Sequence, residues 1–188
     1  MKILCHICCA QCFLGAEKSI RESGYALEGL FYNPNIQPFI EFRRRLKSVR
    51  VLQEQLKFPL HVIDEYEIGA FLGLVAFRQE AAQRCPLCYR MRLYRTAQFA
   101  RANGFDAFTT TLLVSIHQDH DRVAQIGREA GEDAGIEFHR QDFRAAAKVA
   151  HDEAKRRKLY LQSYCGCVFS EYERYKDTTK ELYKGPNA

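Results

Sequence analysis

The sequence predicts an α/β fold, a single domain in which helices cover a mainly parallel sheet. Short apolar runs with β-branched residues alternate with longer segments whose apolar residues recur every three to four positions, as expected for strands alternating with amphipathic helices. The chain has 188 residues, of which 47% are hydrophobic, so it can bury one core and is short for two domains. We therefore expect one domain over residues 1–188, with a helical C-terminal extension at about 159–188.

Five segments have the character of buried strands. The first surrounds Ile3 and Ile7, and the others span residues 25–32, 60–64, 105–114 and 136–139. The stretch 65–84 shows no regular period. The carboxyl ends of parallel strands meet at one edge, which is where open α/β sheets place their sites. We expect functional residues directly after the first strand.

Helices are expected between these strands. The predicted helices span residues 13–23, 41–56, 89–103, 115–134 and 145–158. Ser115 with Gln118 forms a capping-box pattern that predicts the start of the fourth helix. Ser170 with Glu173 forms another, which predicts a terminal helix that a later Gly-Pro pair closes.

Charge and composition limit the function classes. The formal net charge is +5 and the isoelectric point is near 8.8, which favours an anionic partner. No stretch approaches the roughly 20 apolar residues of a membrane span, and the N-terminus lacks a secretory signal. We expect a soluble, cytoplasmic protein without a membrane partner. In a reducing compartment, clustered cysteines are more typical of metal ligands or redox groups than of structural disulfides.

The eight cysteines fall into three tight groups. Four follow the first predicted strand, at Cys5, Cys8, Cys9 and Cys12; two form Cys85-Pro86-Leu87-Cys88; and two form Cys165-Gly166-Cys167. The middle pair is expected to head a helix, where exposed backbone N–H groups favour thiolate over thiol. Together with Cys8 and Cys9 it supplies four thiolates, enough for an all-thiolate zinc site or a [4Fe-4S] cluster. Spacing alone does not choose between these two centres.

The remaining residues of these groups have other expected roles. Cys5 lies inside the strand and is expected to be a buried apolar residue. His6 is expected to be a hydrogen-bonded core residue rather than a ligand, since four thiolates complete a site. A disulfide between Cys165 and Cys167 would close a small, strained and easily reduced ring, which suits redox turnover. The alternative is that both cysteines are additional metal ligands.

Basic and aromatic residues accompany the cysteine motifs. Three basic clusters lie on predicted helices, at Arg43-Arg44-Arg45 with Lys47 and Arg50, at Arg90, Arg92 and Arg95, and at Lys155-Arg156-Arg157-Lys158. Such clusters are either solvated faces or phosphate contacts, which would position a nucleic acid without reading its sequence. Tyr32, Tyr89 and Tyr164 flank the motifs, where they could stack on an unpaired base or pack in the core.

Four motifs, in this order along the chain, carry a resemblance to a known family. They are Cys-His-Ile-Cys-Cys-Ala-Gln-Cys at the N-terminus, Phe-Tyr-Asn-Pro-Asn-Ile-Gln-Pro after the second strand, Arg-Cys-Pro-Leu-Cys-Tyr-Arg-Met-Arg-Leu in mid-chain and Tyr-Cys-Gly-Cys-Val-Phe-Ser near the end. With them the chain resembles epoxyqueuosine reductases of the QueH type over nearly its whole length. The resemblance implies a HUP/PP-loop-like fold and reduction of the epoxide on a modified wobble base of tRNA to queuosine, with electrons from an external donor.

The resemblance also implies a set of site residues. A [4Fe-4S] cluster would be held by the residues matching Cys8, Cys9, Cys85 and Cys88, and the redox-active pair would be Cys165 and Cys167. Cys12 matches a position suited to a second, mononuclear iron. For tRNA itself, the residues favour contacts from Arg43, Arg44, Arg45, Arg90 and Arg92. The chain departs from the family pattern at Gln11 and at Ile116-His117, where proline and proline-aromatic are common, and the second departure lies in the expected pocket wall.

Two alternatives belong to other classes. An ATP-dependent tRNA sulfurtransferase of the PP-loop type would combine a similar sheet with cysteines, but it needs a glycine-rich phosphate-binding turn after the first strand. Here that turn is Cys-Cys-Ala-Gln-Cys, and Gly15 is the nearest glycine. A non-enzymatic, zinc-stapled RNA-binding module would be colourless, whereas an iron-sulfur protein would be brown.

Overall fold

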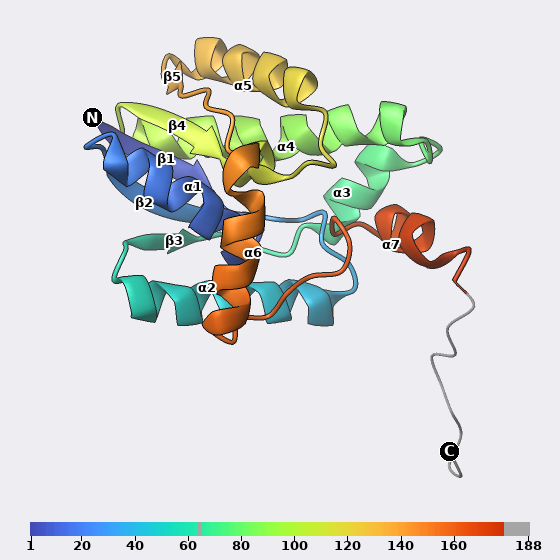
Figure 1. Ribbon diagram of the computed structural model, residues 1–188. Coiled ribbons are helices and arrows are strands. Elements are labelled where there is room, and N and C mark those ends of the chain that lie inside the picture. The colour runs from blue at the N-terminus through green and yellow to red at the C-terminus, as the bar shows by residue number, and fades with distance from the viewer. Residues whose placement is uncertain (64, 179–188) are drawn as a thin grey trace.

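A computed structural model describes residues 1–63 and 65–178 and has a five-stranded, fully parallel sheet at its centre (Figure 1). The strands are β1 (Lys2–His6), β2 (Ala26–Phe31), β3 (Leu60–Val62), β4 (Ala107–Thr110) and β5 (Glu137–Phe138). Their order is β3-β2-β1-β4-β5, so the sheet grows in one direction from β1 to β3 and in the other from β4 to β5. The predicted α/β class with a parallel sheet is confirmed.

Helices cover both faces of this sheet. They are α1 (Ala10–Glu22), α2 (Phe39–Leu56), α3 (Ile68–Val75), α4 (Ala81–Ala102), α5 (His120–Ala134), α6 (Ala147–Arg156) and α7 (Val168–Tyr175), with short 3-10 helices η1 (Thr111–Val114) and η2 (Arg144–Ala146). On one side α1 contacts β2, α2 and α6, while on the other α4 packs against α5, β1 and β4. None of the described helices is both long and apolar enough to cross a lipid bilayer.

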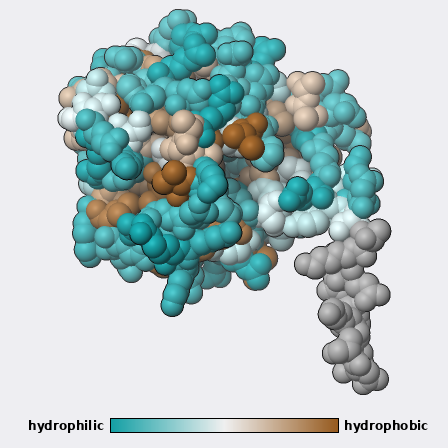
Figure 2. All heavy atoms as spheres, in the orientation of Figure 1, coloured by the Kyte–Doolittle hydropathy of each residue, from teal (hydrophilic) through white to brown (hydrophobic). Residues whose placement is uncertain are grey.

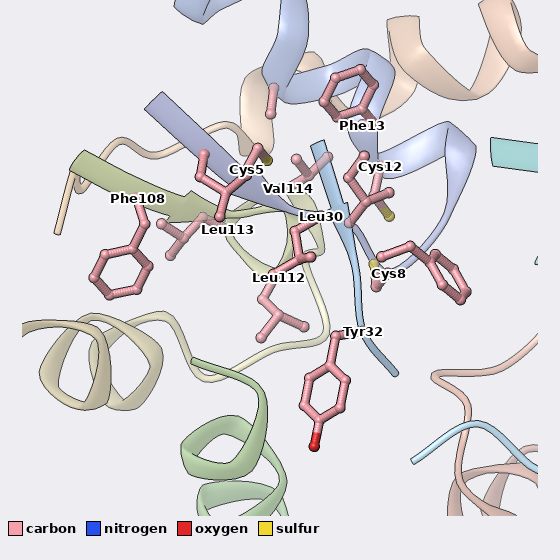
Figure 3. Packing of buried hydrophobic residues seen from close by; sticks show 14 of the residues in the cluster. Cys5, Cys8, Cys12, Phe13, Leu30, Tyr32, Phe108, Leu112, Leu113 and Val114 are labelled. Carbon is pink, nitrogen blue, oxygen red and sulfur yellow. The ribbon is translucent and has the colours of Figure 1, made fainter. Parts of the chain in front are cut away.

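The main core lies between the sheet and its helices. Ile3, Leu4 and Ile7 of the first strand segment are fully buried, as is Phe13 of α1. Figure 3 shows this core at the carboxyl ends of β1 and β4, with Leu112, Leu113 and Val114 of η1 packed beside it. In contrast, hydrophilic residues cover most of the face seen in Figure 2. The hydrophobic periodicity of the sequence therefore identified the interior correctly.

Three predicted boundaries after β3 are wrong, and one helix in this part of the chain was not predicted. The strand predicted over 105–114 ends at Thr110, because the Thr110 hydroxyl accepts from the Leu112 amide at 3.2 Å and turns the chain into η1. The helix predicted from Ser115 starts at His120, where Asp119 caps the Arg122 amide at 2.9 Å. Helix α4 starts at Ala81 instead of residue 89, and α3 occupies part of the stretch expected to be irregular.

The terminal helix also starts earlier than predicted. Helix α7 begins at Val168 with Cys167 as its N-cap, so Ser170 lies inside the helix and bonds back to the Cys167 carbonyl at 2.7 Å. The predicted helix end at Gly185-Pro186 lies outside the described residues. Between α6 and α7 the chain is irregular, and this segment carries Cys165.

Replacing Gly131 by alanine should destabilise the protein. A Cβ atom at this position of α5 would lie 2.6 Å from the backbone oxygen of Ile136, which cannot move aside as a flexible side chain could. We expect a loss of about 1–3 kcal/mol in the free energy of unfolding, measured by urea denaturation followed by circular dichroism.

The matched control for this substitution is Gly73→Ala in α3, where nothing lies within 4 Å of the new Cβ. Here alanine should stabilise by roughly 0.5–1 kcal/mol, because it restricts the unfolded chain and favours the helix. Equal effects of the two substitutions would contradict the packing argument.

Candidate metal centre

The candidate site lies at the point where the strand order reverses. Cys8 and Cys9 follow β1, and Thr111 follows β4, its neighbour in the sheet. The Cys8 amide donates to the Thr111 hydroxyl oxygen at 3.0 Å, and that hydroxyl donates to Cys8 Sγ at 3.2 Å. In doubly wound sheets the helices after two such strands lie on opposite faces, which leaves a crevice at the carboxyl edge. The fold therefore places the first cysteine group at the position expected for a site.

Cys8, Cys9 and Cys12 form a compact, buried triad. Their sulfur atoms all lie within 4.8 Å of one another, and Cys8 Sγ is 3.9 Å from Cys9 Sγ. Two adjacent cysteines can face one point because the strand has ended: Cys9 is the N-cap of α1, and its sulfur accepts from the Cys12 amide at 3.2 Å. Figure 3 shows the sulfur atoms of Cys8 and Cys12 close together, whereas Cys5 lies apart from them.

The triad cannot carry three negative charges without a cation. Hydrogen bonds from Cys12, Cys9 and Thr111 hold the pKa of Cys8 well below its usual range, although burial opposes them. Burial raises the pKa of Cys9, and hydrogen bonding to Cys8 and Cys9 together with burial raises the pKa of Cys12. In the absence of a cation, negative charge in the triad is therefore favoured on Cys8, while Cys9 and Cys12 retain their protons more firmly than free thiols do. A bound metal ion would have to displace the two remaining protons.

The second cysteine pair lies inside α4 rather than at its start. Because the helix begins at Ala81, Cys85 and Cys88 lie beyond its first turn, with Cys88 buried and Cys85 half-buried. Burial raises the pKa of Cys85 to about 11 and that of Cys88 to about 12. The expectation that a helix N-terminus favours thiolates here is therefore wrong: without a cation both residues are neutral thiols at pH 7.

The third pair lies against the second. Cys167 packs in a small apolar cluster with Cys88, Phe71 and Val75. Negative charge on Cys165 or Cys167 raises the pKa of both Cys85 and Cys88, so the two pairs lie within electrostatic reach of each other. Cys165 is an exposed residue, yet protein packed around its thiol raises its pKa, as does negative charge on Cys167 and Cys8.

All eight cysteines are free thiols, and three of them form the compact set. Among the described residues, the ligand atoms that lie within 4.8 Å of one another are those of Cys8, Cys9 and Cys12. Cys85 and Cys88 do not belong to that set, and Cys165 interacts electrostatically with both groups. The structure thus brings Cys8, Cys9 and Cys12 together, while Cys165 lies within electrostatic reach of both Cys8 and the second pair.

Two buried arginines face this site. Arg92 is 1% exposed; its Nε donates to the Cys88 carbonyl at 3.3 Å, and its Nη2 has no hydrogen-bond partner. Burial disfavours its charge, but thiolate charge on Cys88, Cys165 and Cys8 raises its pKa. A buried guanidinium with an unpaired nitrogen, surrounded by thiols, fits a centre that is bound as an anion.

The second arginine, Arg45, fixes the turn that carries Cys165. It forms an ion pair with Glu41 at 2.7 Å, and it donates to the carbonyls of Cys165 at 2.8 Å and Tyr164 at 3.0 Å. Arg45 and Arg92 were predicted to contact tRNA, with a solvated face as the alternative, but both side chains are buried and face the protein interior. Sequence reasoning missed their role, although each lies four residues after a site-related partner, Glu41 or Cys88.

Several other residues singled out in the sequence lie in the core. His6 is a hydrogen-bonded core residue as expected, with Nδ1 2.9 Å from the Thr110 hydroxyl and Nε2 3.1 Å from the Tyr32 carbonyl, and burial lowers its pKa to about 4. Cys5 is fully buried, also as expected. Tyr32 and Tyr89 are 3% exposed and belong to the core, which favours packing over base stacking.

The two departures from the family pattern differ in position. Gln11 lies between Cys9 and Cys12 in the first turn of α1, and its Oε1 lies 3.4 Å from His151 Nδ1. Ile116 is 68% exposed, and His117 is also exposed, on the loop between η1 and α5. Gly15 has a packing role rather than a phosphate-binding one, because a Cβ there would lie 2.7 Å from Val114. This observation disfavours the ATP-dependent alternative.

Metal binding by this site should release protons and strengthen as the pH rises. The raised pKa values of Cys9 and Cys12 mean that these protons are held more tightly than usual and must leave when a cation binds. We expect the affinity for Co²⁺ to rise about tenfold per pH unit for each proton released. The measurement is calorimetry in buffers of different ionisation enthalpy, with Co²⁺–thiolate absorption as the second readout. Affinity independent of pH would contradict the assignment, and Cys12→Ser should release one proton fewer.

Comparisons with known proteins agree on one family. The family model described as "Epoxyqueuosine reductase QueH" matches residues 3–173. A protein named epoxyqueuosine reductase QueH from Dehalococcoides mccartyi is 35% identical over 174 residues, covering 93% of this chain and 94% of the relative. Proteins of the same name from Thermotoga maritima and Histophilus somni are 36% and 30% identical, covering 92% and 95% of this chain and 91% and 74% of their own lengths.

Proposed function

The chain belongs to the epoxyqueuosine reductase QueH family, and we propose that it reduces epoxyqueuosine to queuosine at the wobble position of tRNA in the cytoplasm. The observation that carries the proposal is the family match over residues 3–173 together with the buried thiol triad at the sheet reversal. Neither the ATP-dependent sulfurtransferase nor the zinc-stapled module is favoured by the comparisons.

The reaction requires two electrons and two protons. Converting an epoxide to an alkene breaks two C–O bonds, forms the C=C bond and releases the oxygen as water. A dithiol that is oxidised to a disulfide supplies two electrons and two protons, so Cys165 and Cys167 together balance this reaction. An external electron donor must then return the pair to the dithiol.

The positions of these two residues support such a relay. Cys165 is exposed and Cys167 is buried next to Cys88, so the pair extends from the surface toward the interior thiols. Arg45 holds the Cys165 carbonyl, and the Gln37 amide donates to the Gly166 carbonyl at 2.8 Å. These contacts fix the backbone on both sides of the reactive sulfur.

A [4Fe-4S] cluster on Cys8, Cys9, Cys85 and Cys88, with a mononuclear iron beside Cys12, would supply one-electron transfer and a Lewis acid for the epoxide oxygen. The donor set supports this proposal, because thiolates are the ligands that iron-sulfur clusters require. Arg92 supports it as well, since its unpaired Nη2 and its charge suit an anionic centre. Arg92 would lower the energetic cost of negative charge developing in the site.

Recognition of tRNA is proposed for the exposed basic residues. Arg43 and Arg44 lie exposed on α2, and Arg90 lies exposed on α4, where it also pairs with Glu129 at 2.8 Å. Contacts from these residues to phosphates would position the substrate without reading its sequence. Arg45 and Arg92 are better suited to the interior roles described above.

Protein purified without oxygen should be brown, contain iron and sulfide, and convert epoxyqueuosine in tRNA to queuosine with dithionite as electron donor. Nucleoside mass spectrometry after digestion measures the product. Cys85→Ser and Cys88→Ser should lose both the cluster and the activity, because each removes a proposed ligand. The control is Cys5→Ala, which should keep both. Colourless, zinc-loaded protein without activity would reject the proposed function.

Single replacement of Cys165 or Cys167 by serine should stop multiple turnover while leaving the cluster intact. Without a second thiol no disulfide forms, so we expect the rate to fall on the order of 100-fold or more. The iron content and the visible spectrum should match wild type. Full turnover by either variant would remove the pair from the mechanism, and loss of iron would indicate that the residue is a ligand instead.

A further inference from the structure

A fully exposed aromatic side chain lies beside the cysteine-bearing turn of α4. Phe77, in the linker between α3 and α4, is 100% exposed and has a φ of 60°. Few residues other than glycine adopt this left-handed conformation, and a bulky side chain does so only where its surroundings impose it. A single exposed apolar residue is common on a protein surface. At Phe77 the exposure coincides with an unfavourable backbone conformation, which indicates that this side chain has a function at the surface.

The linker is fixed on both sides of Phe77. The backbone before Phe77 is held by Arg78, the next residue along the chain: its Nη1 donates to the carbonyls of Leu74 at 3.1 Å and Ala76 at 3.3 Å. After it, Arg84 donates to the Gln79 carbonyl, and Arg84 is itself buried and paired with Glu173 of α7. The aromatic ring is therefore presented by a braced loop.

An open groove of about 590 Å³ lies beneath this ring. Its lining includes Phe77, Arg78, Gln83, Pro86, Leu87 and Arg122, and none of its lining residues is acidic. This volume is in the range of small-molecule sites, large enough for one nucleotide unit. Pro86 and Leu87 are the two residues between Cys85 and Cys88, so the groove borders the helical turn that carries the second thiol pair.

The groove carries uncompensated positive charge. No ion pair among the described residues involves Arg78 or Arg122. Within residues 1–63 and 65–178, the Arg122 side chain donates only to the amide oxygen of Gln125, at 3.0 Å. A flat aromatic face next to two guanidinium groups without an acidic partner among the described residues is the combination that binds unpaired nucleotides, by stacking on the base and pairing with the phosphates.

We propose that this groove binds an unpaired nucleotide of the tRNA anticodon loop that neighbours the wobble position. Phe77 stacks on its base, and Arg78 and Arg122 contact the flanking phosphates. This inference rests on the proposed function and adds a second site at which the protein contacts the tRNA substrate. Pro86 and Leu87 project from a different side of α4 than Cys85 and Cys88, so one nucleotide can lie in the groove while its neighbour reaches the thiols about one helix diameter away.

The test measures binding of a synthetic anticodon stem-loop RNA by fluorescence anisotropy. Phe77→Ala and Phe77→Leu should each weaken binding about tenfold or more, whereas Phe77→Trp should bind as well as wild type, because only an aromatic ring stacks. Arg78→Ala and Arg122→Ala should each reduce the slope of log affinity against log salt concentration by about one, the value for one lost phosphate contact. In a second measurement, 2-aminopurine replaces one loop base at a time. At one loop position its fluorescence should be quenched by wild type, where the base stacks on Phe77, and not by Phe77→Leu.

The control is Val149→Ala, which removes another exposed apolar side chain, 67% exposed, from α6 on the opposite face of the sheet. It should bind the RNA like wild type, and circular dichroism should show that all variants are folded. If wild type fails to bind the stem-loop, the tRNA substrate is rejected and this inference with it. If wild type binds and Phe77→Ala binds equally well, only the groove assignment is overturned. A change in sedimentation with unchanged RNA affinity would instead assign the groove to a second copy of the chain.

Discussion

The paired hydrogen bonds between Cys8 and Thr111 join the ends of two neighbouring strands at the sheet reversal. Because β1 and β4 lead into helices on opposite faces, their ends would otherwise separate at this edge. The bonds hold the backbone at the point where Cys9 caps α1, so the sulfur atoms of the triad converge. The remaining cysteine pairs, from α4 and from the segment before α7, are arranged around this fixed centre.

Charge is the second constraint on the site. Buried thiols resist ionisation, and the structure counters this with Arg92 and Arg45, both buried, rather than with solvent. Each arginine also bonds to a backbone carbonyl of a cysteine, Cys88 or Cys165, so the same side chain supplies charge and position. Replacing either residue would therefore affect the electrostatics and the geometry together, and only variants that separate the two effects can assign a cause.

The parallel fold and the placement of Cys8 and Cys9 directly after the first strand could be predicted from the sequence, whereas the interior partners could not. Ile3 and Ile7 marked the central strand, and the grouping of the cysteines marked the site. A helix was predicted from residue 89, but α4 begins at Ala81 and contains Pro86 in its second turn. The burial of Arg45 and Arg92 could not be recognised from the sequence, because charged residues clustered on a helix usually indicate a solvated face. Phe77 was hidden in a stretch without periodicity.

The segment after α6 closes the site from outside, since Gln162 donates to Cys12 Sγ at 3.9 Å and Cys165 lies within electrostatic reach of Cys8. Cys12 is buried beneath this segment, so the rate at which reagents or metal ions reach its sulfur depends on local opening of the segment, whereas the exposed Cys165 is reached directly.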